Sequence, residues 1–399
     1  MSRMREGTQR HEAGMRIALL CHASLGGSSR VATRLAYGLE RRGHSVSLVS
    51  AAPPPAPTKE LSAIRLELFG ARQQSGWTTV IEPMWDMLRL AALERHIETL
   101  VRRDAVEVVH YHYAWPFAHV VRRLKAHLGP ASPLFVGTLH GTDVTHAPDD
   151  EGLEALRDTD VLTTVSQAYS ELAQERLELA GAPRVIPNFV DLDDFPRSVD
   201  FADPGSGRRK PRLVHVSNFR QVKNPEAVAR IFAAVRKRVP AELWLVGEGP
   251  GLAELGRVLD RAGVGADVRV LGYRPEIGRT LAQCDLLLMT SWEESFCLAA
   301  LEAMACGVAV VATSVGGLTE VAEHGRTAML FEPGDYAAAV RLVIGLLGDR
   351  SLRLQIRRRA AERARDFSAR SVVERYEALY RIGCAERSAS DELVAGEVV

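Results

Sequence analysis

The sequence lacks the features that mark several large classes of protein. Among its 399 residues, 50 Lys and Arg balance 50 Asp and Glu, so the formal net charge is zero. A balanced charge argues against a dedicated nucleic-acid binder, although it permits local basic patches. No apolar run approaches the ~20 residues that cross a bilayer, which excludes a membrane-spanning protein. The 46% of apolar and 25% of charged residues are typical of globular domains.

Cysteine is scarce as well. The five cysteines are widely spaced and include no CxxC pair, which excludes a disulfide framework and a zinc knuckle and favours the reducing cytoplasm. The first fourteen residues mix charges of both signs and contain no apolar segment. We therefore expect residues 1–14 to be a disordered extension rather than a secretory signal.

What the chain has is a regular alternation of short apolar runs with amphipathic helical patterns. The runs are rich in Val, Ile and Leu and do not alternate strictly with polar residues, which is typical of parallel strands buried on both faces. The expected strands are 15–23, 45–50, 64–69, 106–113, 134–140, 161–165, 184–186, 212–216, 242–246, 268–271, 286–289, 308–312 and 328–331. This pattern predicts an α/β fold with doubly wound parallel sheets.

The alternation breaks once, at residues 191–211, where Asp, Pro, Gly, Ser and Arg cluster. This composition predicts a linker between two Rossmann-like domains, at 15–190 and 212–365, that face each other across a cleft. We expect a helix at 366–385 to pack back on the N-terminal domain, followed by a tail at 386–399. In such sheets ligands bind beyond the carboxyl ends of the strands, so the loops after strands are the places to look for chemistry.

The first expected strand leads through Leu25-Gly26-Gly27-Ser28-Ser29 into a helix. The glycines either let a phosphate approach the N–H groups at the start of the helix, or form a tight turn with Ser28 as the N-cap. The spacing does not match GxGxxG, so a dinucleotide site is not expected.

Histidines follow two later strands. Alternation places His110 and His112 on one face of a strand, but no third ligand follows at metal spacing, so we favour a role in lining a cleft over metal binding. The segment His140-Gly141-Thr142-Asp143 follows the next strand. Its polar groups could orient a small ligand, while Asp143 could equally cap a turn.

Two cations follow the first strand of the second half. Arg220 and Lys223 are three residues apart, just before an expected helix. Arginine binds an anionic group through two parallel hydrogen bonds and lysine acts as a point charge, so the pair can clamp one anion. Solvated surface charges are the alternative, and the position at the carboxyl end of a strand favours the clamp.

The most informative segment runs from Glu293 to Gly307, with a helix expected from Ser295. If Glu294 and Glu302 lay on one helix they would be about 12 Å apart, beyond the ~5–9.5 Å of a glycosidase carboxylate pair. The two glutamates are better placed to contact distant parts of an extended ligand, with a phosphate at the helix N-terminus between them. Glu302 lies in an otherwise apolar helix, where a ligand hydroxyl would be a natural partner.

Together these segments resemble the GT4 family of retaining glycosyltransferases with the GT-B fold. The resemblance covers about residues 15–385. It rests on Glu294-x7-Glu302 with Glu302-Ala303-Met304-Ala305-Cys306-Gly307, on Gly26-Gly27, Asn188-Phe189-Val190-Asp191 and Gly247-Glu248-Gly249-Pro250, and on the segments that begin at His110, Thr138 and Ser217. Within the family, the segments most resemble members that transfer N-acetylglucosamine from UDP-N-acetylglucosamine to the hydroxyl of L-malate, the first step of bacillithiol biosynthesis.

The resemblance implies a role for each matching residue. The residues implied near the reacting groups are Arg220, Lys223, Glu294 and His140; those implied for the donor are Gly26, Gly27, Phe296, Cys297, Leu298 and Glu302; those implied for malate are Ser28, Tyr113, Thr142 and Asp143. Glu302 would hold the ribose and Glu294 the sugar, while the two cations neutralise the diphosphate. Cys297 stands where the family frequently has glycine, and residues 74–86 fit the family loosely, on the acceptor side.

The mechanism implied is a retaining displacement on one face of the sugar, without a metal. Fixed cations and helix N–H groups would stabilise the charge that develops on the departing UDP. No DxD-type pair stands where it could hold a divalent metal, so no metal or other cofactor is expected. Two alternatives stay open: a GT4 enzyme that acts on a membrane lipid through its arginine-rich C-terminal helices, and a sugar-nucleotide-binding protein without turnover.

Overall fold

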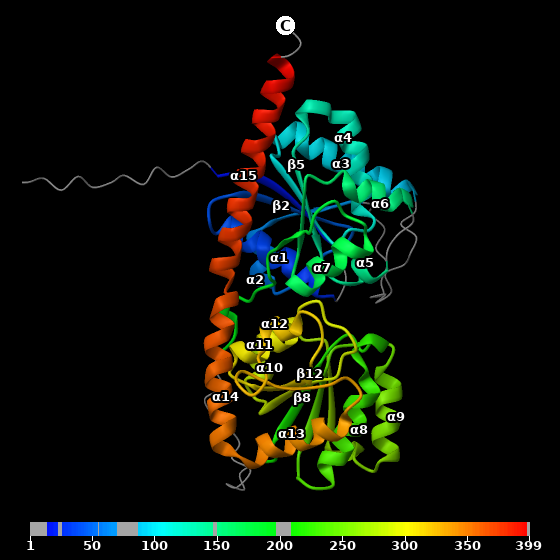
Figure 1. Ribbon diagram of the computed structural model, residues 1–399, viewed down its shortest axis with the longest axis vertical. Coiled ribbons are helices and arrows are strands. Elements are labelled where there is room, and N and C mark those ends of the chain that lie inside the picture. Colours follow the sequence, from blue (N-terminus) through cyan, green and yellow to red (C-terminus); the bar gives the residue numbers. More distant parts are fainter. Residues whose placement is uncertain are drawn as a thin grey trace, which may run out of the picture.

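The computed structural model consists of two α/β domains stacked along the long axis of the molecule (Figure 1). It describes residues 14–22, 26–54, 56–69, 87–146, 150–196 and 209–396. The expected extension up to residue 13, the acceptor-side segment 74–86, most of the linker (197–208) and the end of the tail (397–399) lie outside the described residues.

The N-terminal domain is built on a seven-stranded parallel sheet in the order β3-β2-β1-β4-β5-β6-β7. Its strands are β1 (Arg16–Leu20), β2 (Ser45–Ser50), β3 (Arg65–Leu68), β4 (Val108–His112), β5 (Leu134–Leu139), β6 (Val161–Thr164) and β7 (Arg184–Val185). The strand order reverses between β1 and β4. This reversal is the position where doubly wound sheets open a crevice for ligands.

The C-terminal domain repeats the arrangement with six parallel strands in the order β10-β9-β8-β11-β12-β13. The strands are β8 (Arg212–Val216), β9 (Glu242–Val246), β10 (Val268–Gly272), β11 (Leu286–Met289), β12 (Ala309–Thr313) and β13 (Met329–Phe331). Here the order reverses between β8 and β11. Each of these thirteen strands overlaps a strand expected from the sequence, and β2, β8, β9 and β11 have the expected bounds.

Helices cover both faces of each sheet. Those of the first domain are α1 (Gly27–Glu40), α2 (Thr58–Ala63), α3 (Met87–Asp104), α4 (Phe117–Leu128), α5 (Thr142–Thr145), α6 (Asp150–Arg157) and α7 (Gln167–Arg176). Those that follow are α8 (Pro225–Arg236), α9 (Leu252–Arg261), α10 (Ile277–Leu281), α11 (Leu298–Ala305), α12 (Leu318–Val321), α13 (Tyr336–Gly348), α14 (Arg350–Arg363) and α15 (Ala369–Gly396). Short 3-10 turns include one at Gln221–Lys223.

Because both faces of each sheet are covered, the central strands are buried along their whole length, as in β4 and β11. Burial on both faces removes the polar alternation that a solvent-facing strand would show. This is the physical reason why these strands read as continuous apolar runs in the sequence.

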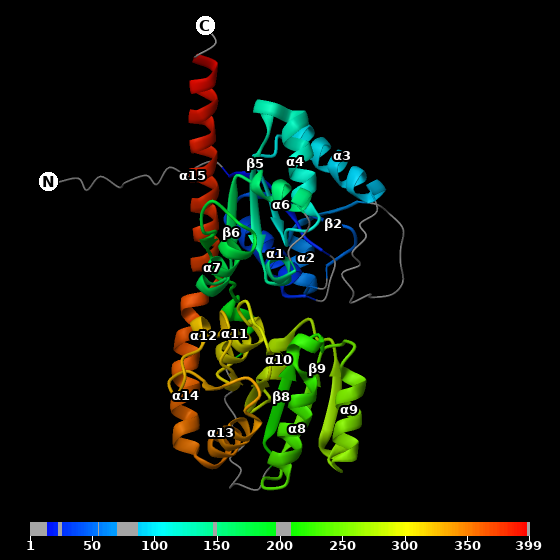
Figure 2. The same ribbon diagram turned by 45° about the vertical axis from the view of Figure 1, so that its right-hand side comes forward.

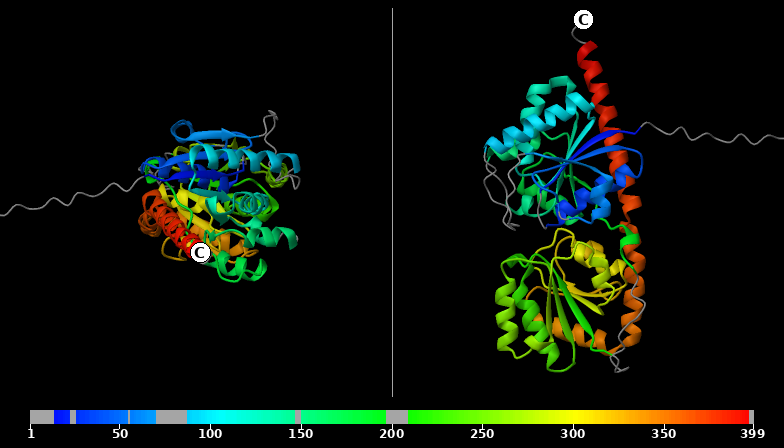
Figure 3. Two further views of the ribbon diagram at one scale, coloured as in Figure 1. Left: turned by 90° about the horizontal axis from the view of Figure 1, so that it is seen from above. Right: turned by 180° about the vertical axis from the view of Figure 1, so that it is seen from behind.

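The last helices run along one side of the molecule and connect the two domains (Figures 2 and 3). Helix α14 packs on α11 and β12 of the C-terminal domain, whereas α15 packs on α1 and β5 of the N-terminal domain. Val373, Tyr376 and Tyr380 of α15 belong to the same buried cluster as Leu19 of β1. Helix α15 continues to Gly396 instead of giving way to a tail after residue 385.

Candidate functional site at the domain junction

The loops that follow the two reversal points meet at the junction of the domains. A Cβ atom placed on Gly27, at the start of α1, would lie 3.3 Å from Cδ1 of Leu298, at the start of α11. The Ser295 hydroxyl donates a hydrogen bond to the backbone carbonyl of His140. The fold therefore brings together residues from both domains that are far apart in the sequence.

Unusual backbone conformations cluster in these loops. Among the described residues, six non-glycine residues have a positive φ, and four of them follow β4, β8 or β11: Tyr113, Phe219, Asn224 and Cys297. Such conformations cost of order 1–3 kcal/mol each and persist only where the surrounding structure enforces them. They are found most often at functional sites. These strained residues thus lie in the loops at the points where the strand order of the two sheets reverses.

The start of α11 differs from the expectation. The helix begins at Leu298 rather than near Ser295, because Cys297 takes the left-handed conformation, with φ of 73°, as the N-cap. Glu294 is therefore in the loop before the helix, and the spacing of two glutamates on one helix does not apply. Among the described residues, the backbone N–H groups of Phe296, Cys297 and Leu298 have no hydrogen-bond acceptor. Together with the helix dipole they form a site suited to an anion.

The side chain of Glu294 is held by its own domain. One carboxylate oxygen lies 2.8 Å from Nζ of Lys223 and accepts a hydrogen bond of 2.7 Å from the hydroxyl of Ser291. In this structure Lys223 is therefore paired with a carboxylate of its own domain.

Among the described residues, Arg220 has no such carboxylate partner. It caps the 3-10 turn after β8, and its Nε atom is sealed from solvent without a hydrogen-bond partner among the described residues. Its guanidinium lies near the phenol of Tyr113, where it opposes the rise in the Tyr113 pKa that burial causes. A guanidinium that pairs with no described carboxylate and lies near the other domain is suited to binding an anionic ligand.

Glu302 does have partners, and they come from the opposite domain. Its carboxylate lies 2.7 Å from Nη2 of Arg30 and 3.2 Å from Nη1 of Arg34, both on α1. The Glu302 side chain is only 1% exposed and that of Arg30 14%. A buried carboxylate needs such partners, because an unpaired one would be costly.

Asp143 has a structural role that the sequence left open. Its side chain is 0% exposed and accepts hydrogen bonds from the N–H groups of Ala114 (3.1 Å), His140 (2.9 Å) and Gly141 (2.7 Å). Burial raises its pKa to about 6, although the N–H groups oppose the rise. In this structure Asp143 ties the loops after β4 and β5 together, and it has no exposed surface with which to touch an acceptor.

The other residues expected to bind the acceptor line the N-terminal side of the junction. Tyr113 and Thr142 share a hydrogen bond of 3.0 Å between their hydroxyl groups, and both are half-buried. Ser28 lies in the first turn of α1, which has Gly26 rather than Ser28 as its N-cap. These hydroxyl groups can bind a polar ligand.

His140 is paired with a second histidine. Its Nε2 atom lies 3.0 Å from Nδ1 of His112, at the end of β4. Burial lowers the pKa of His140 to about 3 and that of His112 well below its ordinary value, so both rings are neutral at pH 7. His110 uses both of its nitrogens, toward Tyr380 and Thr138, each at 2.7 Å.

The described histidines and acidic residues do not gather into a metal-type cluster. Within the ranges that the structure describes, no group of three or more His, Cys, Asp or Glu side chains could hold a metal ion.

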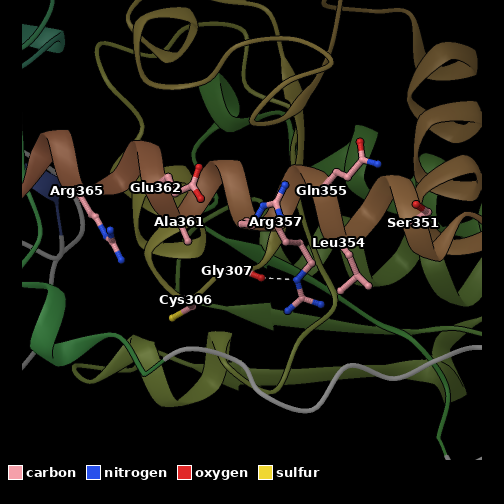
Figure 4. Close-up of a pocket in the computed structure, with 10 residues that line it drawn as sticks. Cys306, Gly307, Ser351, Leu354, Gln355, Arg357, Ala361, Glu362 and Arg365 are labelled. Atoms are coloured by element: carbon pink, nitrogen blue, oxygen red, sulfur yellow. Dashed lines mark hydrogen bonds between the residues drawn. The ribbon is translucent and has the colours of Figure 1, made fainter.

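A separate hollow opens where the end of α11 meets α14 (Figure 4). It is lined by Cys306, Gly307, Ser351, Leu354, Gln355, Arg357, Arg358, Ala361, Glu362 and Arg365. Within it, Nε of Arg357 donates a hydrogen bond to the carbonyl of Gly307. None of the residues expected to bind or transfer substrate lines this hollow.

Sequence reasoning missed three residues of the junction. Arg30 and Arg34 were not expected there, although their spacing of four residues at the start of α1 places them on one helical face. His22 follows β1, and its ring packs edge-on against Tyr113 with centroids 5.3 Å apart. Its position after a central strand was the signal that could have found it.

Comparisons with known proteins agree with this arrangement. The family described as Glycosyltransferase Family 4 matches residues 25–194, and the one described as Glycosyl transferases group 1 matches residues 197–365. The chain is 32% identical over 375 residues to N-acetyl-alpha-D-glucosaminyl L-malate synthase of Bacillus anthracis. This alignment covers 92% of this chain and 96% of the relative. It is 30% identical over 240 residues to a D-inositol 3-phosphate glycosyltransferase of Corynebacterium jeikeium, in an alignment that covers 55% of this chain and 56% of the relative.

Among solved structures, sucrose-phosphate synthase from Thermosynechococcus elongatus superposes with a TM-score of 0.77 at 22% identity, covering 93% of this chain and 100% of the other. The likeness shows the same two-domain fold. With both halves matched by glycosyltransferase families and a full-length relative above 30% identity, the chain belongs to the GT4 family of glycosyltransferases, with the GT-B fold.

Proposed function

We propose that the protein transfers N-acetylglucosamine from UDP-N-acetylglucosamine to the hydroxyl of L-malate with retention of configuration, the first step of bacillithiol biosynthesis. The observation that carries this proposal is the alignment with N-acetyl-alpha-D-glucosaminyl L-malate synthase of Bacillus anthracis, which extends over 92% of the chain and so includes both domains. The match thus includes the N-terminal domain, on which this proposal places the acceptor, as well as the C-terminal domain.

In this proposal the C-terminal side of the junction binds the donor. The diphosphate would lie between Arg220 and the free N–H groups at the start of α11, with Gly27 close to it from the other domain. Glu302 would accept hydrogen bonds from the ribose hydroxyls and Glu294 from the sugar. Lys223, held 2.8 Å from Glu294, would bridge the sugar side and the phosphate side.

The acceptor would lie on the N-terminal side, against Ser28, Tyr113 and Thr142. Tyr113 is close enough to Arg220 for the guanidinium to affect its pKa, so an acceptor at Tyr113 would be near the diphosphate as well. Asp143 would act as a positioning residue that fixes the loops, and His140 would lie beside the transferred sugar.

The transfer step needs charge stabilisation more than a nucleophile. The bond between the anomeric carbon and the phosphate oxygen breaks, the malate oxygen forms the new bond on the same face, and the malate hydroxyl proton moves to the departing phosphate. Arg220 and the α11 N–H groups would stabilise the negative charge that develops on UDP. We propose that these fixed groups take the place of a divalent metal, so that transfer is metal-independent.

A second candidate acceptor is an inositol phosphate, because D-inositol 3-phosphate glycosyltransferases match about half of the chain. A lipid acceptor is less well supported. In the arginine-rich C-terminal helices that suggested this acceptor, Arg357 is buried and Arg363 pairs with Asp366 at 2.8 Å. None of the described helices is both long and apolar enough to cross a membrane.

The experiment is to measure UDP release from UDP-N-acetylglucosamine with L-malate, with D-inositol 3-phosphate and with no acceptor, each with and without EDTA. The proposal expects release that depends on malate and persists in EDTA. Release that depends on the inositol phosphate would favour the second candidate, and unchanged donor in every mixture would favour a binding protein without turnover.

A further inference from the structure

The pairing of His112 with His140 bears on which ring nitrogen of His140 carries the proton, as well as on the position of the ring. His112 is 0% exposed at the end of β4, and its Nδ1 atom lies 3.0 Å from Nε2 of His140. Its other ring nitrogen, Nε2, is sealed from solvent and has no hydrogen-bond partner among the described residues. The two nitrogens of His112 therefore have very different surroundings.

A hydrogen bond between two neutral imidazoles requires a proton on one of the facing nitrogens and a lone pair on the other. If the His112 proton were on Nε2, a buried N–H donor would be left without an acceptor, which costs about 1–3 kcal/mol. If it is on Nδ1, that N–H donates to His140 and only a lone pair remains without a partner at Nε2. The second arrangement is therefore favoured.

This arrangement determines where His140 carries its own proton. Because Nε2 of His140 accepts the hydrogen bond, the proton of the neutral ring must be on Nδ1. No described residue bonds to Nδ1 of His140, and this atom is not among those sealed from solvent. The main chain of His140 is fixed by Asp143 and Ser295. The ring thus presents an N–H donor, at a fixed place, to whatever binds at the junction.

We propose that His112 is a positioning residue that fixes His140 as the Nδ1–H tautomer, so that His140 donates a hydrogen bond to an oxygen of the transferred sugar. The role of the donated hydrogen bond rests on the function proposed above, whereas the tautomer itself does not.

The His112 ring is held in place by the neighbouring ring of His110. The His110 ring packs against it at a tilt of 36°, with centroids 4.3 Å apart. His110 is in turn hydrogen-bonded to Tyr380 of α15 and Thr138 of β5. A ring confined in this way loses little further freedom when it donates to His140, which is the condition for accurate positioning.

The test compares three variants with the wild type. His112→Phe keeps a ring but removes the donor, whereas His112→Asn keeps an N–H donor close to the place of Nδ1. Tyr111→Phe is the matched control: it removes a buried hydrogen bond, 2.7 Å to Thr159, from the same strand but from its other face. Long-range ¹H–¹⁵N spectra of the imidazoles report the tautomer of His140 without any substrate.

We expect the wild type and His112→Asn to show His140 protonated at Nδ1. We expect His112→Phe to lower kcat about 10- to 100-fold with a smaller change in KM, His112→Asn to recover most of kcat, and Tyr111→Phe to lower stability with kcat retained. A wild-type His140 protonated at Nε2, or a kcat for His112→Phe equal to that of Tyr111→Phe, would overturn the proposal. If malate is not an acceptor but His140 is protonated at Nδ1, the tautomer assignment stands and the proposed function fails.

Discussion

Arg30 of α1 and Glu302 of α11 form an ion pair across the domain junction, with 2.7 Å between nitrogen and oxygen. Arg34 contacts the same carboxylate oxygen at 3.2 Å. Glu302 is the residue that we propose to hold the ribose of the donor, yet only 1% of its side chain is exposed in this structure. A nucleotide can therefore reach the carboxylate only if Arg30 moves away from it.

The first prediction follows from this competition. Replacing Arg30→Gln removes the ion pair that the ribose must displace, so UDP should bind about three- to tenfold more tightly, equivalent to ~0.7–1.4 kcal/mol. Isothermal titration calorimetry with UDP measures this change. The ion pair between Arg41, the C-cap residue of α1, and Asp191, at 3.6 Å, supplies the control, because Arg41→Gln should leave the affinity unchanged. Weaker binding by Arg30→Gln would mean that Arg30 holds the nucleotide instead of competing with it, while Glu302→Ala should weaken binding in either case.

The second prediction concerns the charge on the departing nucleotide. Arg220→Ala should lower kcat about 100- to 1,000-fold, the size typical of removing one preorganised donor from a developing oxyanion. Arg220→Lys keeps the charge but not the two parallel hydrogen bonds, so its loss should be smaller. Steady-state kinetics with the donor in excess separate kcat from KM. Turnover that survives in Arg220→Ala would place the diphosphate elsewhere.

The third prediction uses the backbone at the start of α11. Glycine normally destabilises a folded protein relative to alanine, but Cys297 has a φ of 73°, a conformation that costs about 1–2 kcal/mol with any Cβ. Cys297→Gly should therefore be more stable than Cys297→Ala by about 1 kcal/mol. Urea unfolding of both variants measures the difference. The control is Ala300→Gly, within α11, where glycine should be less stable than the wild-type alanine by about 1 kcal/mol. If Cys297→Gly is no more stable than Cys297→Ala, the backbone of residue 297 is not strained.

The fourth prediction is a pH dependence of stability. Burial lowers the pKa of His110 from 6.5 to about 3, so below pH 6.5 the unfolded chain binds a proton that the folded protein does not. The stabilisation is complete above pH 6.5 and is lost as the pH falls toward 3, by ~1.4 kcal/mol per pH unit for this group. His110→Gln should reduce the slope of unfolding free energy against pH by that amount between about pH 6 and 4. An unchanged slope would show that His110 is protonated in the folded protein.

Most of the fold could be predicted from the sequence because its strands are buried on both faces. The apolar runs at Leu286–Met289 and Glu242–Val246 have no competing helical pattern. The start of α11 could not be predicted, because the left-handed conformation of Cys297 is imposed by its surroundings and contradicts the ordinary preference of a non-glycine residue.

The site was only partly predictable for a different reason. The loops after the strands could be located, since the topology fixes them, but the partners of individual side chains depend on contacts over long sequence distances. The pairing of Glu302 with Arg30 spans 272 residues, and no local pattern specifies it. Likewise, the N–H groups that saturate Asp143 come from two loops that meet only in the folded sheet.

The most direct measurement is an NMR spectrum of the product formed from UDP-N-acetylglucosamine and L-malate by the wild-type protein in EDTA. We expect a single new glycoside, with the small anomeric coupling constant of an α-linkage and a through-bond correlation from the anomeric proton to the hydroxyl-bearing carbon of malate. A β-linked product, or free N-acetylglucosamine as the only new sugar, would contradict retaining transfer to malate.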